Sequence, residues 1–224
     1  MIRMRDSILY DRTASIGIGA LIVFIALVLV AGIAASVIIS TSSTLESQTM
    51  ATGRQTTDEV AAGFAVYSIE AYAATGSDIS KLAILVRPRA GTSSIDLSST
   101  YLELSDTNKK IILNYTNSFY SAPTGQNDIF GADVFPNFGG TGDGTTFGLL
   151  VLDDPDSSMS STTPIMNRGD KVFICINTTG CFNDIAERID VWGTVVPEIG
   201  SPADFEFRTP STFSNNVMEI LLYM

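Results

Sequence analysis

The sequence predicts an α+β protein, in which one long, apolar N-terminal helix precedes an all-β domain. Two observations predict this class. The 33 residues from Thr13 to Leu45 carry no charge. Beyond about residue 60 the chain changes to short β-rich runs bounded by Gly, Pro, Asn or Asp. We therefore expect residues 15–60 to form a helix and residues 61–224 to form a sandwich or barrel of the immunoglobulin-like kind.

The apolar part of the helix is long enough to cross a bilayer. Residues 16–39 are apolar or glycine except for Ser36, and 24 helical residues span roughly 36 Å, against about 30 Å of hydrocarbon. A cleaved secretory signal has a shorter apolar run. The side chains that we expect to form the apolar contact surface of this helix are Ile18, Leu21, Ile22, Phe24, Ile25, Leu27, Val28 and Leu29.

The polar stretch that follows allows two interpretations. Residues 41–60 contain no proline and only one glycine, Gly53, so one continuous helix from Ser15 to about Val60 is possible. A membrane helix followed by a flexible Ser/Thr linker is equally consistent with these residues, because residues 40–44 are all serine or threonine.

A short charged leader precedes the apolar run. It carries Arg3, Arg5 and Arg12 and ends in small residues around Ala14 and Ser15. In a secretory signal the small residues follow the apolar run instead. Cleavage between Ala14 and Ser15 would remove residues 1–14 and leave the apolar helix as the new N-terminus. Cleavage after Gly19 is the alternative.

The composition excludes several functions. The formal charge is −11, and removal of residues 1–14 leaves 10 basic and 22 acidic residues. Nucleic-acid binding needs a basic surface, so it is not expected. The chain has no histidine, no G-x-S-x-G motif and no phosphate-binding loop, so we predict neither an enzyme nor catalytic residues, and no cofactor.

The expected strands are short runs with high β propensity. They comprise residues 64–72, 82–86, 100–104, 110–115, 147–152, 171–176, 189–196 and 217–223.

Three further features concern modification or ligand binding. A hairpin could bring Cys175 and Cys181 together in a disulfide, although two buried thiols or a metal pair are alternatives. Asn114 and Asn177 begin N-glycosylation sequons, and Asn177, at the tip of that hairpin, is the better candidate. Residues 153–156 and Asp143 could offer oxygen ligands to Ca²⁺, but without an EF-hand spacing we expect a solvated acidic loop and predict no metal site.

Several segments resemble one known family. The run GIGALIVFIALVLVA at residues 17–31 is similar to the start of mature archaellins, the archaeal flagellins. Further similar segments are ATGRQTT at 51–57, ISKLAILV at 79–86, IDLS at 95–98, GTVVPE at 193–198 and FRTP at 207–210. Residues 116–163 carry no such match.

The resemblance implies a structural subunit of the archaellum filament, which serves swimming motility. It favours the long continuous helix, cleavage by a prepilin-type peptidase after Ala14, and glycosylation. It also implies polymerisation with identical or related archaellins, storage of the precursor in the cytoplasmic membrane, an assembly motor and an extracellular location. The alternatives are a type IV-like adhesion pilin and a single-pass, membrane-anchored extracellular binding module.

Overall fold

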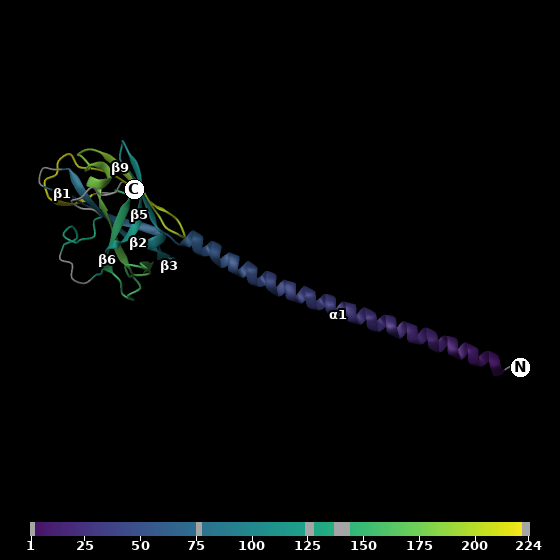
Figure 1. Cartoon of the computed structure of the whole chain (residues 1–224). Coiled ribbons are helices and arrows are strands. Elements are labelled where there is room, and N and C mark those ends of the chain that lie inside the picture. Colours follow the sequence, from purple (N-terminus) through teal and green to yellow (C-terminus); the bar gives the residue numbers. More distant parts are fainter. Residues whose placement is uncertain (1–2, 75–77, 124–127, 137–143, 221–224) are drawn as a thin grey trace. The chain divides into compact units, whose positions relative to one another are not determined.

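The computed structural model describes residues 3–74, 78–123, 128–136 and 144–220 of the 224-residue chain, with side chains described from residue 16 onward. Contacts within the chain divide it into two units, Met1–Gln55 and Thr56–Met224. The first consists of helix, and the second carries the last helical residues and the β domain (Figure 1).

Helix α1 runs without interruption from Arg3 to Ala61, a length of 59 residues. The expectation of one continuous helix to about Val60 is therefore confirmed, and the flexible-linker alternative is wrong. Threonine hydroxyls in the polar stretch are hydrogen-bonded within the helix. Those of Thr41, Thr44 and Thr49 donate to backbone carbonyls three or four residues earlier, at 2.7–3.0 Å. The side chains thus find partners inside the helix, whose backbone remains helical throughout this stretch.

The second unit is mostly strands. They are β1 (Phe64–Ala73), β2 (Ile79–Pro88), β3 (Ser94–Asp96), β4 (Tyr101–Ser105), β5 (Lys110–Ser121), β6 (Thr146–Asp153), β7 (Ile165–Asn167), β8 (Lys171–Asn177), β9 (Asp190–Val196), β10 (Ala203–Arg208) and β11 (Val217–Ile220). Two short helical segments accompany them, the 3-10 turn η1 (Leu97–Ser99) and α2 (Thr178–Phe182).

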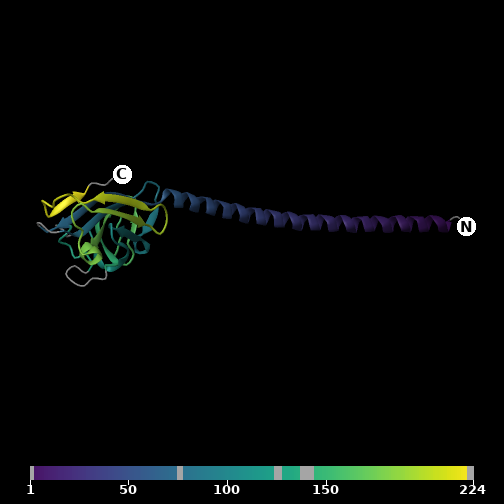
Figure 2. The same ribbon diagram turned by 90° about the horizontal axis from the view of Figure 1, so that it is seen from above.

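Nine strands form one sheet in the order β10-β9-β4-β5-β6-β8-β2-β1-β11, and β3 and β7 pair separately. Neighbours are antiparallel except β5 and β6, which are parallel. The sheet curves until its ends approach each other, because Gly63 just before β1 bridges to Ser201 just before β10. Figure 2 shows the C-terminal strands in yellow along one side of the domain. Of the two expected architectures, the nearly closed barrel is the one that forms.

Apolar side chains are buried on both faces of the central strands. The larger cluster fills the barrel and includes Leu82, Ile84, Val172 and Ile174. The alternate residues of the same strands point to a second cluster, which residues 129–135 cover and which includes Phe173. Burial on both faces explains why β2, β6 and β8 read as almost continuous apolar runs.

Each expected run corresponds to an observed strand; the bounds agree to within one residue at each end for most of them, but β2 and β5 are five and six residues longer than expected. Within the described residues, β3, β7 and β10 were not predicted. The expected last strand, residues 217–223, is observed as Val217–Ile220; residues 221–223 lie outside the described residues.

Candidate functional site

The apolar side chains of α1 are the most unusual surface of this protein. The predicted contact residues are 49–66% exposed, although they would stabilise any assembly that buried them. They are Ile18, Leu21, Ile22, Phe24, Ile25, Leu27, Val28 and Leu29. This is the one helix among the described residues that is long and apolar enough to cross a membrane, and a signal sequence near the N-terminus would pass the same test.

Small residues leave open space along this helix. A methyl group added at Gly17, Gly19 or Gly32 would meet no atom within 4 Å apart from the adjoining backbone of its own helix. At such positions a second helix can approach closely. The candidate cleavage residues Ala14 and Ser15 lie within α1, upstream of these glycines.

The two cysteines do not form the expected disulfide. Both lie within the described residues, and the structure has them as two thiols. Residues 178–182 form the helix α2 instead of a hairpin turn. Cys175 therefore stays in β8 and packs in the outer cluster, whereas Cys181 packs in the cluster inside the barrel. Burial raises the pKa of the Cys175 thiol well above its ordinary value.

The structure favours the other of the two sequons. Asn177 is 5% exposed, and its amide nitrogen, where a glycan would be attached, donates to the Pro136 carbonyl at 3.0 Å. Its amide oxygen accepts from the backbone of Thr179 and Gly180 and caps α2. Asn114 is exposed on β5. The accessible sequon is therefore the one at Asn114.

One acidic cluster joins residues that are distant in the sequence. Carboxylate oxygens of Asp154, Asp156 and Asp170 lie within 4.8 Å of one another. Asp170 is 1% exposed, its Oδ1 has no hydrogen-bond partner, and burial raises its pKa. Oxygen donors of this kind suit a hard divalent cation such as Ca²⁺. Residues 153–156 were predicted as possible oxygen ligands, whereas Asp170 was not; Asp143 lies outside the described residues.

Comparisons with known proteins agree on one family. The family model for archaeal-type flagellins matches residues 14–207. Flagellin B3 of Methanocaldococcus jannaschii is 44% identical over 212 residues, which cover 94% of this chain and 96% of that protein. Flagellin B3 of Thermococcus kodakarensis is 37% identical over 252 residues, with 93% and 98% coverage.

Solved structures are similar as well. The crystal structure of archaeal flagellin FlaB1 from Methanocaldococcus jannaschii has a TM-score of 0.61 at 29% identity, covering 71% of this chain and 97% of that one. The archaeal flagellum of Methanospirillum hungatei strain JF1 has a TM-score of 0.59 at 14% identity, covering 90% and 98%, a likeness of fold. The chain therefore belongs to the archaeal-type flagellins, the structural, non-enzymatic subunits of the extracellular archaellum filament.

Proposed function

We propose that this flagellin is made as a precursor anchored in the cytoplasmic membrane by α1, is cut by a prepilin-type peptidase between Ala14 and Ser15, and then polymerises through α1 into the filament core. The observation that carries the proposal is the row of exposed apolar side chains along a helix with 33 uncharged residues, from Thr13 to Leu45. The family match begins at Ala14, next to the proposed cut, and covers the whole of α1 that would remain.

Hydrophobic burial alone does not drive the transfer of α1 from the membrane into the filament. Moving a Leu or Ile side chain from water into an apolar environment contributes about 1.5–3 kcal/mol. A helix that leaves a lipid bilayer for a helical bundle gains none of this, because lipid is already apolar. Assembly therefore depends on close packing between helices, which the open glycine positions permit, and on work by an assembly motor.

The polar half of α1 fits the same route. The Thr41, Thr44 and Thr49 hydroxyls are already hydrogen-bonded within their own helix. Burial of a polar group is costly mainly when it loses its partner. The helix can consequently be surrounded by other helices over its uncharged length and its first polar turns.

Leu27→Asp tests polymerisation through α1. Leu27 is 63% exposed on the isolated helix. An unpaired charge at this position costs about 2.5–3.5 kcal/mol in lipid on insertion scales. It is also costly inside a bundle of apolar helices. We expect electron microscopy to show no filaments from cells making Leu27→Asp, and normal filaments from the apolar control Leu27→Met. Circular dichroism of the purified variant should still report the β domain. Filaments of normal number and length from Leu27→Asp would exclude a core role for α1.

A further inference from the structure

Basic side chains gather at one end of β2 and β8. These strands pair antiparallel, and their last registered pair at this end is Val86 with Val172. Arg87 and Lys171 come next on the two strands. Arg89 follows β2 and Arg168 precedes β8. All four are exposed, and they are four of the 10 basic residues that remain after removal of residues 1–14.

These cations have few anionic partners within the chain. Lys171 Nζ lies 3.4 Å from Asp153 Oδ2, and the Arg87 guanidinium lies over the Tyr67 ring, 4.9 Å from its centroid. Among the described residues, no carboxylate lies within 4.0 Å of Arg87, Arg89 or Arg168. Like charges on adjacent strands repel each other. An anion from outside this chain would relieve that repulsion.

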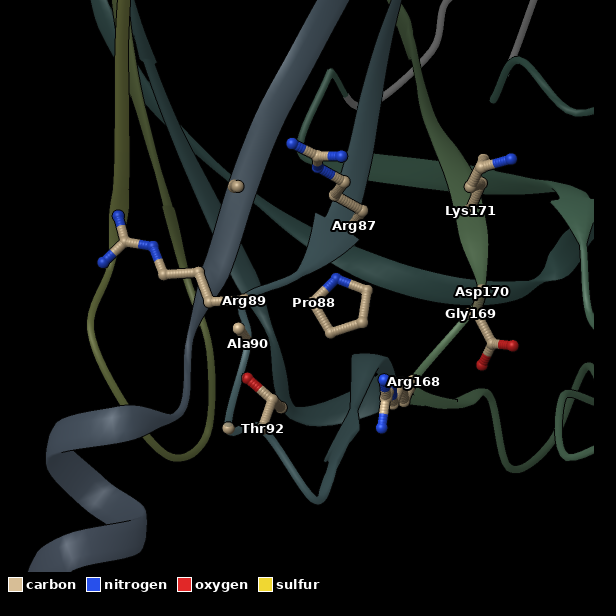
Figure 3. Close-up of a pocket in the computed structure, with 11 residues that line it drawn as sticks. Arg87, Pro88, Arg89, Ala90, Thr92, Arg168, Gly169, Asp170 and Lys171 are labelled. Atoms are coloured by element: carbon tan, nitrogen blue, oxygen red, sulfur yellow. The ribbon is translucent and has the colours of Figure 1, made fainter.

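The four residues line a pocket of about 730 Å³, whose wall also includes one acid, Asp170, so that four cations face a single carboxylate. Figure 3 shows their charged groups spread around Pro88, with Arg89 on one side and Lys171 on the other, so that they do not converge on one point. A single small anion could contact only some of them. The arrangement therefore favours a partner that carries more than one carboxylate.

The pocket adjoins the point at which α1 ends. Its wall includes Gly91, where an added methyl group would lie 3.1 Å from the Cβ of Ala61, the last residue of α1. The final turn of the same helix carries two adjacent exposed acids, Asp58 and Glu59. Every copy of the chain thus has a basic pocket beside the end of its helix and an acidic pair on that helix end.

We propose that the basic pocket receives Asp58 and Glu59 of a neighbouring copy in the filament. The inference rests on the proposed polymerisation through α1, which places the helix ends of neighbouring copies close to one another. It explains how subunits with 22 acidic and 10 basic residues after loss of the leader can associate: their net charges repel at long range, but basic and acidic groups meet at the contact.

The test is charge reversal on each side of the contact, in full-length protein made by cells that lack the parent chain. In Arg87→Glu/Arg168→Glu filaments, we expect the temperature of dissociation, measured by light scattering, to fall by about 3 °C or more. Single reversals give the matched comparison: Arg87→Glu, in the pocket, should lower that temperature, whereas Arg188→Glu, at an exposed arginine outside the pocket, should leave it nearly unchanged. Added salt should lower the dissociation temperature of parent filaments and have less effect on the pocket variant.

Rescue identifies the partner residues. Combining Arg87→Glu/Arg168→Glu with Asp58→Arg/Glu59→Arg restores opposite charges across the contact, so the dissociation temperature should return toward that of the parent. If the pocket variant is as stable as the parent, or if the combined variant is not rescued, the pocket proposal is refuted. Filaments from Leu27→Asp would instead refute polymerisation through α1, so the two failures are distinguishable.

Discussion

Glu70 of β1 lies directly opposite Glu219 of the C-terminal strand β11 in the antiparallel register. Burial raises the pKa of the Glu70 carboxyl from its usual 4.5, and the facing Glu219 raises it further. Like charges at directly paired positions destabilise a sheet. This pair therefore weakens the attachment of the last described strand at neutral pH.

Replacing one carboxylate should strengthen the domain. Because the folded pKa of Glu70 is raised, the native state binds this proton more tightly than the unfolded state does, so the stability associated with Glu70 falls as pH rises above 4.5 through the folded pKa. We expect Glu219→Gln to raise the free energy of unfolding at neutral pH by about 0.2–1 kcal/mol. The gain should shrink as the pH approaches 4.5.

Thermal unfolding of the mature chain, kept monomeric in detergent, measures this effect. Glu187→Gln removes an exposed carboxylate elsewhere in the domain and serves as the control. An equal gain in both variants would mean that net charge, rather than the facing pair, is responsible.

Processing can be tested at the cut itself. Ala14→Trp places a bulky side chain where a narrow protease subsite needs a small one, so we expect the precursor to accumulate with its leader attached. Ala14→Gly keeps the residue small and should be processed. Mass spectrometry of the N-terminal peptide distinguishes Met1 from Ser15 as the first residue of the chain. A chain from Ala14→Trp that still starts at Ser15 would contradict this requirement at the cut.

The cysteines should behave as two thiols. Cys175 is fully buried and its pKa is raised, so it should resist alkylation in the native protein and react only after unfolding. Without any reductant, the unfolded chain should take up two alkyl groups. A chain that takes up none until a reductant is added would show that the pair is a disulfide after all. Filaments collected from the cell exterior are the appropriate sample.

Glycosylation should depend on Asn114. Thr116→Ala removes the sequon and should remove the glycan mass from the peptide that carries Asn114, whereas Thr116→Ser preserves the sequon and should retain it. Asn177→Gln should leave the glycan mass unchanged but lower stability by about 1 kcal/mol, because it disturbs the cap of α2. A glycan found on Asn177 would require the Pro136 contact to open.

The main features of the fold could be predicted because each depends on a local pattern. The uncharged run from Thr13 to Leu45 needs no tertiary context to be recognised as a helix, and strands such as β8 were apparent from β-branched and aromatic residues between turn residues. Strand β10 was missed although its signal was present. Ala203–Arg208 alternates buried and exposed residues along its whole length.

The errors at the candidate sites have a common cause. Asn177 and the residues after it have the composition of a hairpin turn, and the same residues form a helix once the Asn177 side chain caps it. Because α2 forms instead of a hairpin turn, Cys181 lies in a different cluster from Cys175, and the sequon at Asn177 is buried. Asp170 could not be connected with Asp154 and Asp156 from sequence, because only the folding of β7 and β8 brings them together.

The threonines of α1 have a consequence for how the protein changes surroundings. In this helix the threonine hydroxyls and the backbone groups are hydrogen-bonded to one another. The helix therefore needs only apolar contacts from its surroundings, whether these are lipids or neighbouring copies of the helix. Moving from one to the other then exchanges neighbours without breaking a hydrogen bond at Thr41, Thr44 or Thr49. Helix α1 can therefore keep the same conformation while the subunit is stored in the membrane and after it joins a growing filament.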